Sequence, residues 1–151
     1  MSERQASVLS PSEGEVFTIG ALKIVSRVVG SMSGDQIELY DLILGPFVID
    51  YHVHMKTDET LCVVDGEIEF IVDGQTFVRG AGSVAYVPRG IHHGFRNKGP
   101  GGARVLALFN PAGGQSDYFR QLEKLAAAEK PDLDAIRALQ ARFDQVLVPA
   151  P

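Results

Sequence analysis

Residues 51–66, which read YHVHMKTDETLCVVDG, contain most of the information about the fold of this chain. His52 and His54 stand two positions apart on a predicted strand, so both side chains point to the same face, about 7 Å apart. Glu59 follows a short polar connection, where the chain can turn and begin a neighbouring strand. Asp65-Gly66 ends the stretch with a dipeptide that tolerates the positive φ angles of a tight turn. The stretch therefore predicts two successive strands with two histidines and a glutamate near their junction.

On both sides of this stretch, short β-branched or aromatic runs are separated by turn residues, which is typical of β-strands. Asp73-Gly74 repeats the hairpin dipeptide. The intervening residues 67–72 begin by alternating charged and apolar side chains, as a strand with one solvated face does. The sequence therefore predicts an all-β, antiparallel meander, folded as a sandwich or a barrel. The predicted strands are 22–29, 36–44, 47–54, 60–64, 67–72, 76–78, 83–87, 93–96 and 104–109.

After Pro111 the spacing of apolar residues changes to that of α-helices. Tyr118, Leu122 and Leu125 form the apolar stripe of a first helix. Pro131-Asp132 then ends that helix and starts a second one. Both stripes are interpreted as packing surfaces. The first helix has the candidate N-caps Ser116 and Asp117, and the stripe of the second consists of Leu133, Ile136, Leu139 and Phe143.

The composition fits one domain with one core, since the chain has 151 residues and 45% of them are hydrophobic. We predict a flexible lead-in at 1–14, a β-barrel domain at 15–111 and a helical tail at 112–151 packed on the barrel. No apolar run has the length of a signal peptide core or a membrane span, which favours a cytoplasmic protein. The net charge of −5 makes nucleic acids and anionic membranes poor partners, so small molecules remain. Cys62, the one cysteine, is interpreted as a buried structural thiol.

The histidines fall in two short clusters, and the second cluster is His92-His93 after the turn residues Pro88-Arg89-Gly90. A strand beginning near His93 can bring a third imidazole to the first cluster. Three neutral imidazoles and one carboxylate suit a first-row divalent metal ion and are too rich in nitrogen for calcium or magnesium. An isolated His-x-His pair is more often surface or satisfied core. Its coincidence with a spaced Glu and a distant Pro-x-Gly-x-x-His favours a metal site.

These spacings resemble the two sequence motifs of the cupin superfamily. The first motif is matched by His52-Val53-His54, four residues, Glu59, six residues and Gly66. The second is matched by Gly82, five residues, Pro88-Arg89-Gly90, two residues, His93, three residues and Asn97.

One departure from the family pattern precedes the first motif. Gly45 stands seven positions before His52, whereas the pattern places a glycine six positions before it. A one-residue bulge at the entrance of the strand would absorb the difference.

The resemblance implies an all-β, double-stranded β-helix (jelly-roll) cupin barrel with two short C-terminal helices. It also implies one divalent Fe, Mn, Ni or Zn ion inside the barrel. His92 is the rival of His93 as a ligand, and the motif favours His93. Strand alternation then places Phe95 and Asn97 on the same inward face and His92 at the rim. The implied metal ligands are His52, His54, Glu59 and His93.

The tail after Asn110 is similar to that of small bacterial single-domain cupins of the quercetin-dioxygenase type, a group that also resembles the monocupin polyketide cyclases. This similarity implies a metal-dependent dioxygenase acting on a small aromatic or enolisable substrate, with Glu59 as the catalytic base. The alternatives are a zinc-dependent polyketide cyclase and a non-catalytic cupin that binds a metal or a small ligand. Similar cupins often dimerise through sheet edges, so a homodimer is expected. The candidate substrate-binding residues, chosen for their aromatic faces, are Phe47, Tyr51, Tyr86, Phe95 and Phe109.

Overall fold

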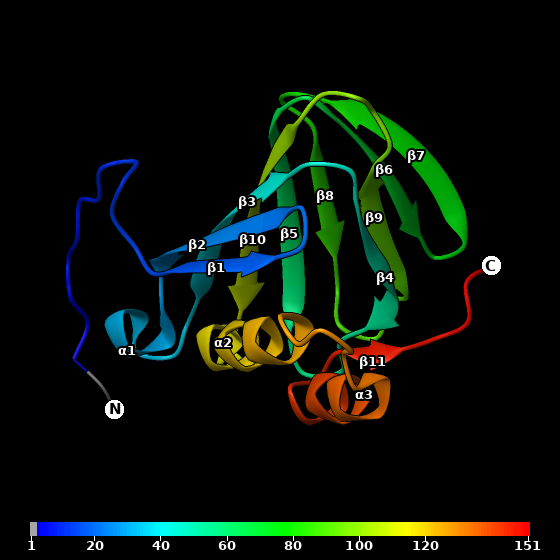
Figure 1. Cartoon of the computed structure of the whole chain (residues 1–151). Helices are drawn as coiled ribbons and strands as arrows, with labels where there is room; N and C mark the ends of the chain where they lie inside the picture. The colour runs from blue at the N-terminus through cyan, green and yellow to red at the C-terminus, as the bar shows by residue number, and fades with distance from the viewer. Residues whose placement is uncertain (1–2) are drawn as a thin grey trace.

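The computed structural model describes residues 3–151 and contains two antiparallel β-sheets that face each other, with helices across one open end (Figure 1). The helices are α1 (Gly30–Ser33), α2 (Gln115–Ala126) and α3 (Leu133–Arg142). The strands are β1 (Val16–Ile19), β2 (Leu22–Val28), β3 (Glu38–Leu44), β4 (Phe47–Val53), β5 (Asp58–Asp65), β6 (Glu67–Val72), β7 (Gln75–Gly80), β8 (Val84–Val87), β9 (His93–Asn97), β10 (Ala103–Asn110) and β11 (Val146–Leu147).

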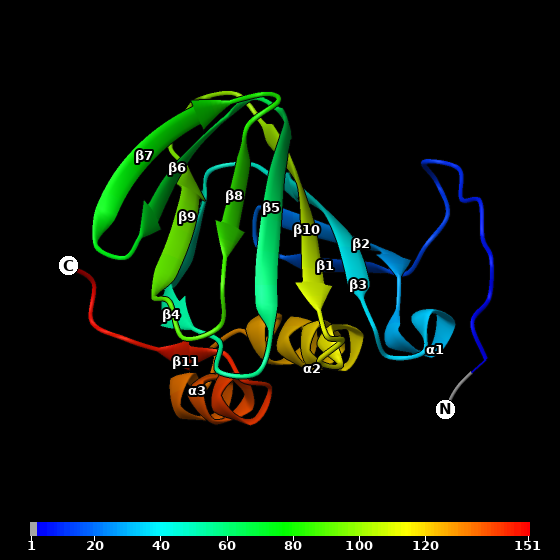
Figure 2. The same cartoon turned by 180° about the vertical axis from the view of Figure 1, so that it is seen from behind.

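One sheet has the strand order β1-β2-β3-β10-β5-β8, and the other has the order β11-β4-β9-β6-β7. Between β3 and β10, every connection except β6–β7 crosses from one sheet to the other, as in a jelly roll. Figure 2 shows both layers from behind, with α1 and β11 on opposite sides of the molecule. Within residues 3–151 no backbone ladder joins the two sheets, so the jelly roll is an open sandwich rather than a closed barrel.

The predicted meander is correct for β1, β2 and β3 and for the pair β6 and β7, which are neighbours both along the chain and in the sheet. Asp73 and Gly74 in the turn between β6 and β7 have φ angles of 49° and 74°, as a two-residue hairpin requires. Asp65-Gly66, in contrast, carries the chain from β5 to β6 in the opposite sheet. A Cβ atom on Gly66 would lie 2.7 Å from the Gly102 carbonyl oxygen, so this crossover needs glycine. An Asp-Gly pair thus predicts a tight turn without distinguishing a hairpin from a crossover.

The core lies between the sheets and follows from strand alternation. On β10 every second residue from Ala103 to Phe109 is buried, and on β5 the inward positions are those of Glu59, Leu61 and Val63. Cys62 lies between these positions and is half-buried. The interpretation of Cys62 as a buried core thiol is therefore wrong, because its neighbours occupy the inward face.

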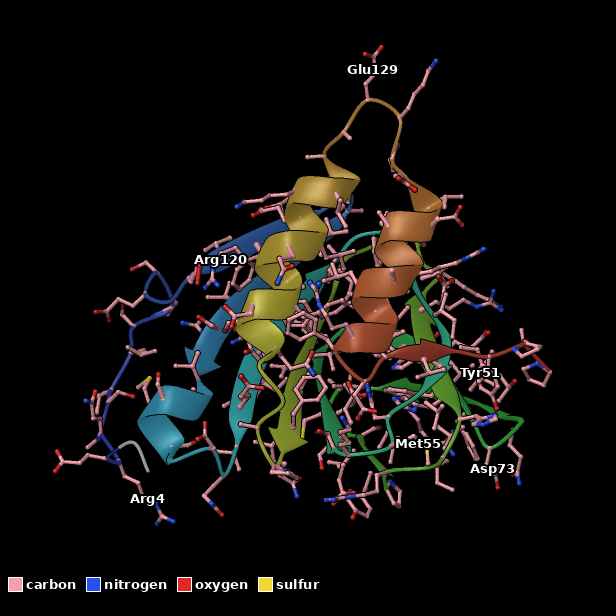
Figure 3. All side chains as sticks on the ribbon, turned by 90° about the horizontal axis from the view of Figure 1, so that it is seen from below. Arg4, Tyr51, Met55, Asp73, Arg120 and Glu129 are labelled. Carbon is pink, nitrogen blue, oxygen red and sulfur yellow. The ribbon has the colours of Figure 1, made fainter. Side chains whose placement is uncertain are left out.

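Helices α2 and α3 lie side by side across one end of the sandwich, with Glu129 at the tip of their connection (Figure 3). Most of the two predicted stripes pack against the core, with Tyr118 and Leu139 buried, but Leu133 at the start of α3 is 63% exposed. Phe119, outside the predicted stripe, is buried as well. Asp132 is the N-cap of α3, and its side chain accepts hydrogen bonds from two backbone N–H groups of the first turn.

The N-terminus of α2 differs from the prediction, which offered Ser116 or Asp117 as the cap. The N-cap is Gly114, with a left-handed φ of 73° and no capping side chain of its own. Glu38 on β3 replaces that side chain: its Oε2 accepts from the backbone N–H groups of Gly113 and Gln115. The cap therefore comes from a distant strand, which ties α2 to the sandwich.

The segment before β1 has no regular structure in residues 3–15 and is exposed. The Arg27 guanidinium donates hydrogen bonds to the carbonyl groups of Ser10, Pro11 and Glu13, so this part of the segment follows β2. The flexibility of the lead-in stays a prediction, and for residues 1 and 2 it lies outside the described residues. Among the helices of residues 3–151, none is both long and apolar enough to cross a membrane.

Candidate metal centre

Four buried side chains from strands of both sheets converge between the layers. His52 lies on β4, Glu59 on β5 and His93 on β9, and His54 directly follows β4. Each is at most 4% exposed, and one potential ligand atom from each lies within 4.8 Å of the other three. His54 Nε2 is 3.1 Å from His52 Nε2 and 3.2 Å from Glu59 Oε2. His93 Nε2 is 2.7 Å from Glu59 Oε2.

The pairing of β4 with β9 explains why His52 and His93 lie opposite each other. Ile49 pairs with Phe95 and His52 pairs with His93, so β4 carries one extra residue between the two pairs. A Cβ atom on Gly94 would lie 2.8 Å from the Ile49 carbonyl oxygen, so glycine permits the close approach. The one-residue bulge expected from the sequence is present, but it lies in the middle of β4 rather than at the strand entrance.

The structure separates the two adjacent histidines. His93 is 1% exposed and belongs to the cluster. His92 is exposed and places its ring 5.9 Å from that of Tyr51. Phe95 and Asn97 are buried with His93, as the alternation of an extended strand requires. Of the two adjacent histidines in the second motif, His93 lies in the cluster and His92 does not.

The turn before His93 is tied to the first motif. The Gly90 N–H donates to the His54 carbonyl oxygen at 2.7 Å. Arg89 donates to Asp58 from both its backbone and its guanidinium. These hydrogen bonds lower the pKa of Asp58 to about 2. The position of His93 relative to the other three side chains is thus fixed by contacts between the two motifs.

Each imidazole of the cluster is oriented through its Nδ1 atom, which faces a backbone carbonyl oxygen. The three pairs are His52–Asp50 at 2.6 Å, His54–Asp144 at 2.8 Å and His93–Ile91 at 3.1 Å. A carbonyl oxygen only accepts hydrogen bonds, so Nδ1 carries the proton and Nε2 is left with a lone pair. Three nitrogen lone pairs and a carboxylate oxygen therefore face one another.

This arrangement fits a divalent transition metal ion. Lone pairs on nitrogen atoms about 3 Å apart repel one another, and a cation between them turns the repulsion into attraction. Three imidazole nitrogens and one carboxylate oxygen form a donor set for first-row divalent ions. Carbonyl groups on the second ring nitrogens are the usual means by which proteins orient metal-binding histidines.

Burial and mutual contact shift the pKa values within the cluster in different directions. Burial, with the neighbouring His93, lowers the pKa of His52 to about 3. Burial acts most strongly against the charged form of His54, but the contacts with Glu59 and Asp144 together outweigh it and raise the pKa of His54. Burial alone would raise the pKa of Glu59, but the adjacent imidazoles of His54 and His93 hold it below its ordinary value. Glu59 is therefore an ionised carboxylate in a buried position, where a bound cation would balance its charge.

A cavity of about 230 Å³ opens onto His52, His54 and Glu59. Its other lining side chains are mainly apolar and come from both sheets and both C-terminal helices. A cavity of this kind, with a few convergent polar groups, is typical of a site for a small organic ligand. Three of the five aromatic candidates line the cavity, namely Phe47, Phe95 and Phe109.

The other two aromatic candidates lie elsewhere. Tyr86 is 60% exposed on β8, because the inward position of this strand segment belongs to Val87. Tyr51 is half-buried, and its hydroxyl accepts a hydrogen bond from the Gly74 N–H at 3.0 Å. Neither tyrosine lines the cavity. The structure therefore does not bring these two tyrosines to the cavity that the other three aromatic candidates line.

The sequence reasoning missed the residues that the C-terminal segment brings to the site. The Asp144 carbonyl oxygen accepts from His54, and the Asp144 carboxylate accepts from the backbone N–H groups of Met55 and Lys56. The short strand β11 pairs with β4 at His52 and Val53. Other missed residues line the cavity from the helices and the loop after α3: Gln115, Tyr118, Gln140 and Gln145. No local spacing marks the three glutamines, and the helical spacing of Tyr118 indicates only a packing residue. The docking of the helices is what places these side chains at the cavity.

The comparison with known families agrees with the fold and the cluster. Residues 40–109 match the model of the cupin domain. This range contains all four clustered side chains and the strands from most of β3 to most of β10. Residues 40–109 are therefore identified as a cupin domain, and two C-terminal helices follow it.

Relatives within the family include enzymes with different activities. The chain is 30% identical to a quercetin 2,3-dioxygenase of Bacillus subtilis over 95 residues, which is 62% of this chain and 28% of that protein. It is 35% identical to the polyketide synthase CurC of Streptomyces cyaneus over 63 residues, which is 42% of this chain and 41% of that protein. The chain thus spans less than half the length of either relative. An RmlC-like cupin of Shewanella frigidimarina has a similar structure, with a TM-score of 0.66, 23% identity, and coverage of 77% of this chain and 99% of that chain.

Proposed function

We propose that this protein binds one divalent transition metal ion through His52, His54, Glu59 and His93, and acts as a dioxygenase on a small aromatic or enolisable substrate. The observation that carries the proposal is the convergence of three oriented Nε2 lone pairs and a carboxylate at the wall of an apolar cavity. The similarity to a quercetin 2,3-dioxygenase supports the oxygen chemistry.

The four side chains have separate tasks in this proposal. An iron, manganese or nickel ion would supply Lewis acidity and redox chemistry toward dioxygen. The histidines hold fixed positions through their carbonyl partners, so they need little rearrangement on binding. Glu59 Oε2, at the cavity wall, is placed to take the proton of an enol or phenol hydroxyl and so acts as the base.

The apolar walls have a task as well. Phe47, Phe95 and Phe109 offer ring faces and edges to a planar substrate. They also exclude water from the site, which strengthens the electrostatic contacts with the charged end of the cavity. We propose these three residues as the substrate-binding aromatics.

The 35% identity to the polyketide synthase CurC favours a role in polyketide biosynthesis, and the second candidate function is therefore that of a polyketide cyclase. The same donor set suits zinc, which has no redox chemistry and acts by polarising a carbonyl group. In that case the cavity would hold a flexible polyketone instead of a planar phenol. Glu59 would act as the base that removes a proton from a carbon next to a carbonyl group.

The test is dioxygen uptake by protein reconstituted separately with iron, manganese, nickel and zinc. The substrate panel consists of flavonols and simpler phenols. We expect uptake with at least one redox-active metal and none with zinc, and we expect His92→Ala to behave like the wild type. If every metal is bound at one ion per chain and no phenol in the panel supports uptake, the dioxygenase proposal is wrong and the cyclase becomes the better one.

The proposal also includes the oligomeric state of the protein. β1 and β8 are the edge strands of the six-stranded sheet, and exposed edges are a common route to pairing between subunits. We propose that the protein is a homodimer. We also propose that each subunit consists of a lead-in at 1–14, a β-domain at 15–111 and a helical tail at 112–151. Light scattering during size-exclusion chromatography checks the dimer, and a monomer at all concentrations contradicts it.

A further inference from the structure

Helices α2 and α3 form one side of the cavity, here called the helical wall. This wall contains a buried polar group that the proposed reaction does not use. Gln140 on α3 lines the cavity and is 9% exposed. Within residues 3–151, its Oε1 atom has no hydrogen-bond partner, and it is the one buried side-chain polar atom in this situation. A buried acceptor without a partner destabilises the folded protein, and nearly all such groups are paired in native structures. An unpaired acceptor in the wall of a cavity is available to accept a hydrogen bond from a ligand.

Tyr118 on α2 provides a donor beside this acceptor. Its side chain is 1% exposed and lines the same cavity. Burial raises the pKa of Tyr118 to about 12, and a hydrogen bond with the Gln140 side chain opposes that rise. The phenol therefore keeps its proton at neutral pH, and the two side chains lie near each other. A ligand group that donates to an amide oxygen and accepts from a phenol is a hydroxyl.

We propose that Gln140 and Tyr118 form a subsite for a hydroxyl group of the substrate, in which Gln140 Oε1 accepts and Tyr118 Oη donates. The inference rests on the proposed function in one respect: it takes from that proposal that the other end of the substrate lies at the metal ligands. It narrows the substrate class to aromatic or enolic compounds that carry a second hydroxyl, apart from the oxygen directed at the metal site. The apolar side chains between the two polar walls accommodate the ring that joins the two oxygens.

The substitution Gln140→Met removes the amide and keeps a similar length and volume. The matched control is Arg137→Met, on the exposed surface of the same helix. The first measurement is the melting temperature of the metal-free proteins, which does not depend on the proposed reaction. Gln140→Met removes an unpaired buried acceptor together with a hydrogen bond to Tyr118, and the two effects oppose each other, so we expect its melting temperature to change by less than about 4 °C. Arg137→Met should leave the melting temperature nearly unchanged.

The second measurement is ligand binding to zinc-loaded protein by calorimetry, since zinc avoids turnover. The probes are benzohydroxamate against its meta- and para-hydroxy derivatives, and an unsubstituted flavonol against its para-hydroxyphenyl counterpart. We expect the wild type and Arg137→Met to bind at least one hydroxylated probe roughly tenfold more tightly than its parent. In Gln140→Met that preference should disappear, while the parent compounds bind as before.

The outcomes separate the subsite from the proposed function. A fall in the melting temperature of Gln140→Met well beyond about 4 °C shows that the amide oxygen also has a structural partner, and it overturns the subsite. Equal affinity for parents and hydroxylated probes in the wild type, or a preference that survives in Gln140→Met, also overturns it. Tight, hydroxyl-selective binding without any dioxygen uptake keeps the subsite and removes the dioxygenase. Failure of every probe to bind overturns the subsite as stated, whatever the metal site does.

Discussion

The cavity has a strand wall, formed by β4, β5 and β9 around the candidate metal ligands, and a helical wall, formed by α2 and α3. The two walls differ in how completely their polar groups are hydrogen-bonded within the protein. On the strand wall, the Nδ1 atoms of His52, His54 and His93 each have a carbonyl partner within the protein. On the helical wall, Gln140 has an acceptor without a hydrogen-bond partner among the described residues. The strand wall is thus fixed before any substrate arrives, as a metal site requires. The helical wall is left to be completed by a ligand, which suits a surface that selects substrates.

The largest expected effect comes from removing a ligand on the strand wall. His54→Ala takes away one nitrogen donor and leaves the other three side chains in place. We expect metal affinity to fall more than about 100-fold, beyond the 10–100-fold typical of losing an orienting partner. The fold should survive, because the core lies mainly in apolar contacts between the sheets. Metal titration and far-ultraviolet circular dichroism check the two parts, and full metal occupancy in this variant would show that His54 is not a ligand.

A smaller effect is expected where the two walls meet, at Asp144. This residue has a φ of 62°, a region that Asp tolerates better than Ala. Asp144→Ala removes a carboxylate that accepts two backbone hydrogen bonds next to His54 and disturbs the carbonyl that orients it. We expect metal affinity to fall about 10–100-fold and the free energy of unfolding to fall by about 1–3 kcal/mol.

Asp132→Ala is the matched control for Asp144→Ala. It also removes a carboxylate that accepts two backbone hydrogen bonds, but at the opposite end of α3. We expect a stability loss of about 0.5–2 kcal/mol with unchanged metal affinity. Denaturant unfolding and metal titration measure both variants. Equal metal affinities in the two would show that the C-terminal segment does not orient His54.

The smallest effect concerns the helical wall at alkaline pH. Burial raises the pKa of Tyr118 to about 12 from an ordinary value of 10.0. The unfolded chain loses this proton first, so the stability due to the neutral buried phenol is full below pH 10 and is lost as the pH rises toward 12. We expect Tyr118→Phe to lose less stability than the wild type between these values, as measured by denaturant unfolding. An identical loss in both proteins would mean that Tyr118 is ionised without penalty.

The strand wall could be predicted from the sequence because its geometry is local. Alternation along β4 and β9 places His52 and His93 inward, and the motif spacings supply His54 and Glu59. The helical wall could not be predicted in this way. Gln140 follows no polar pattern within α3, and its place in the cavity depends on how that helix docks. β11 has only two residues, too few for any periodicity, yet it anchors the segment that holds Asp144.

Metal stoichiometry in the two adjacent-histidine variants tests the central claim most directly. Purified His92→Ala, His93→Ala and wild-type protein are titrated with zinc after chelation, with elemental analysis of the desalted samples. We predict one ion per chain for the wild type and for His92→Ala, and almost none for His93→Ala, since only His93 reaches the cluster. Equal zinc content in all three proteins would mean that the four buried side chains are not a metal site.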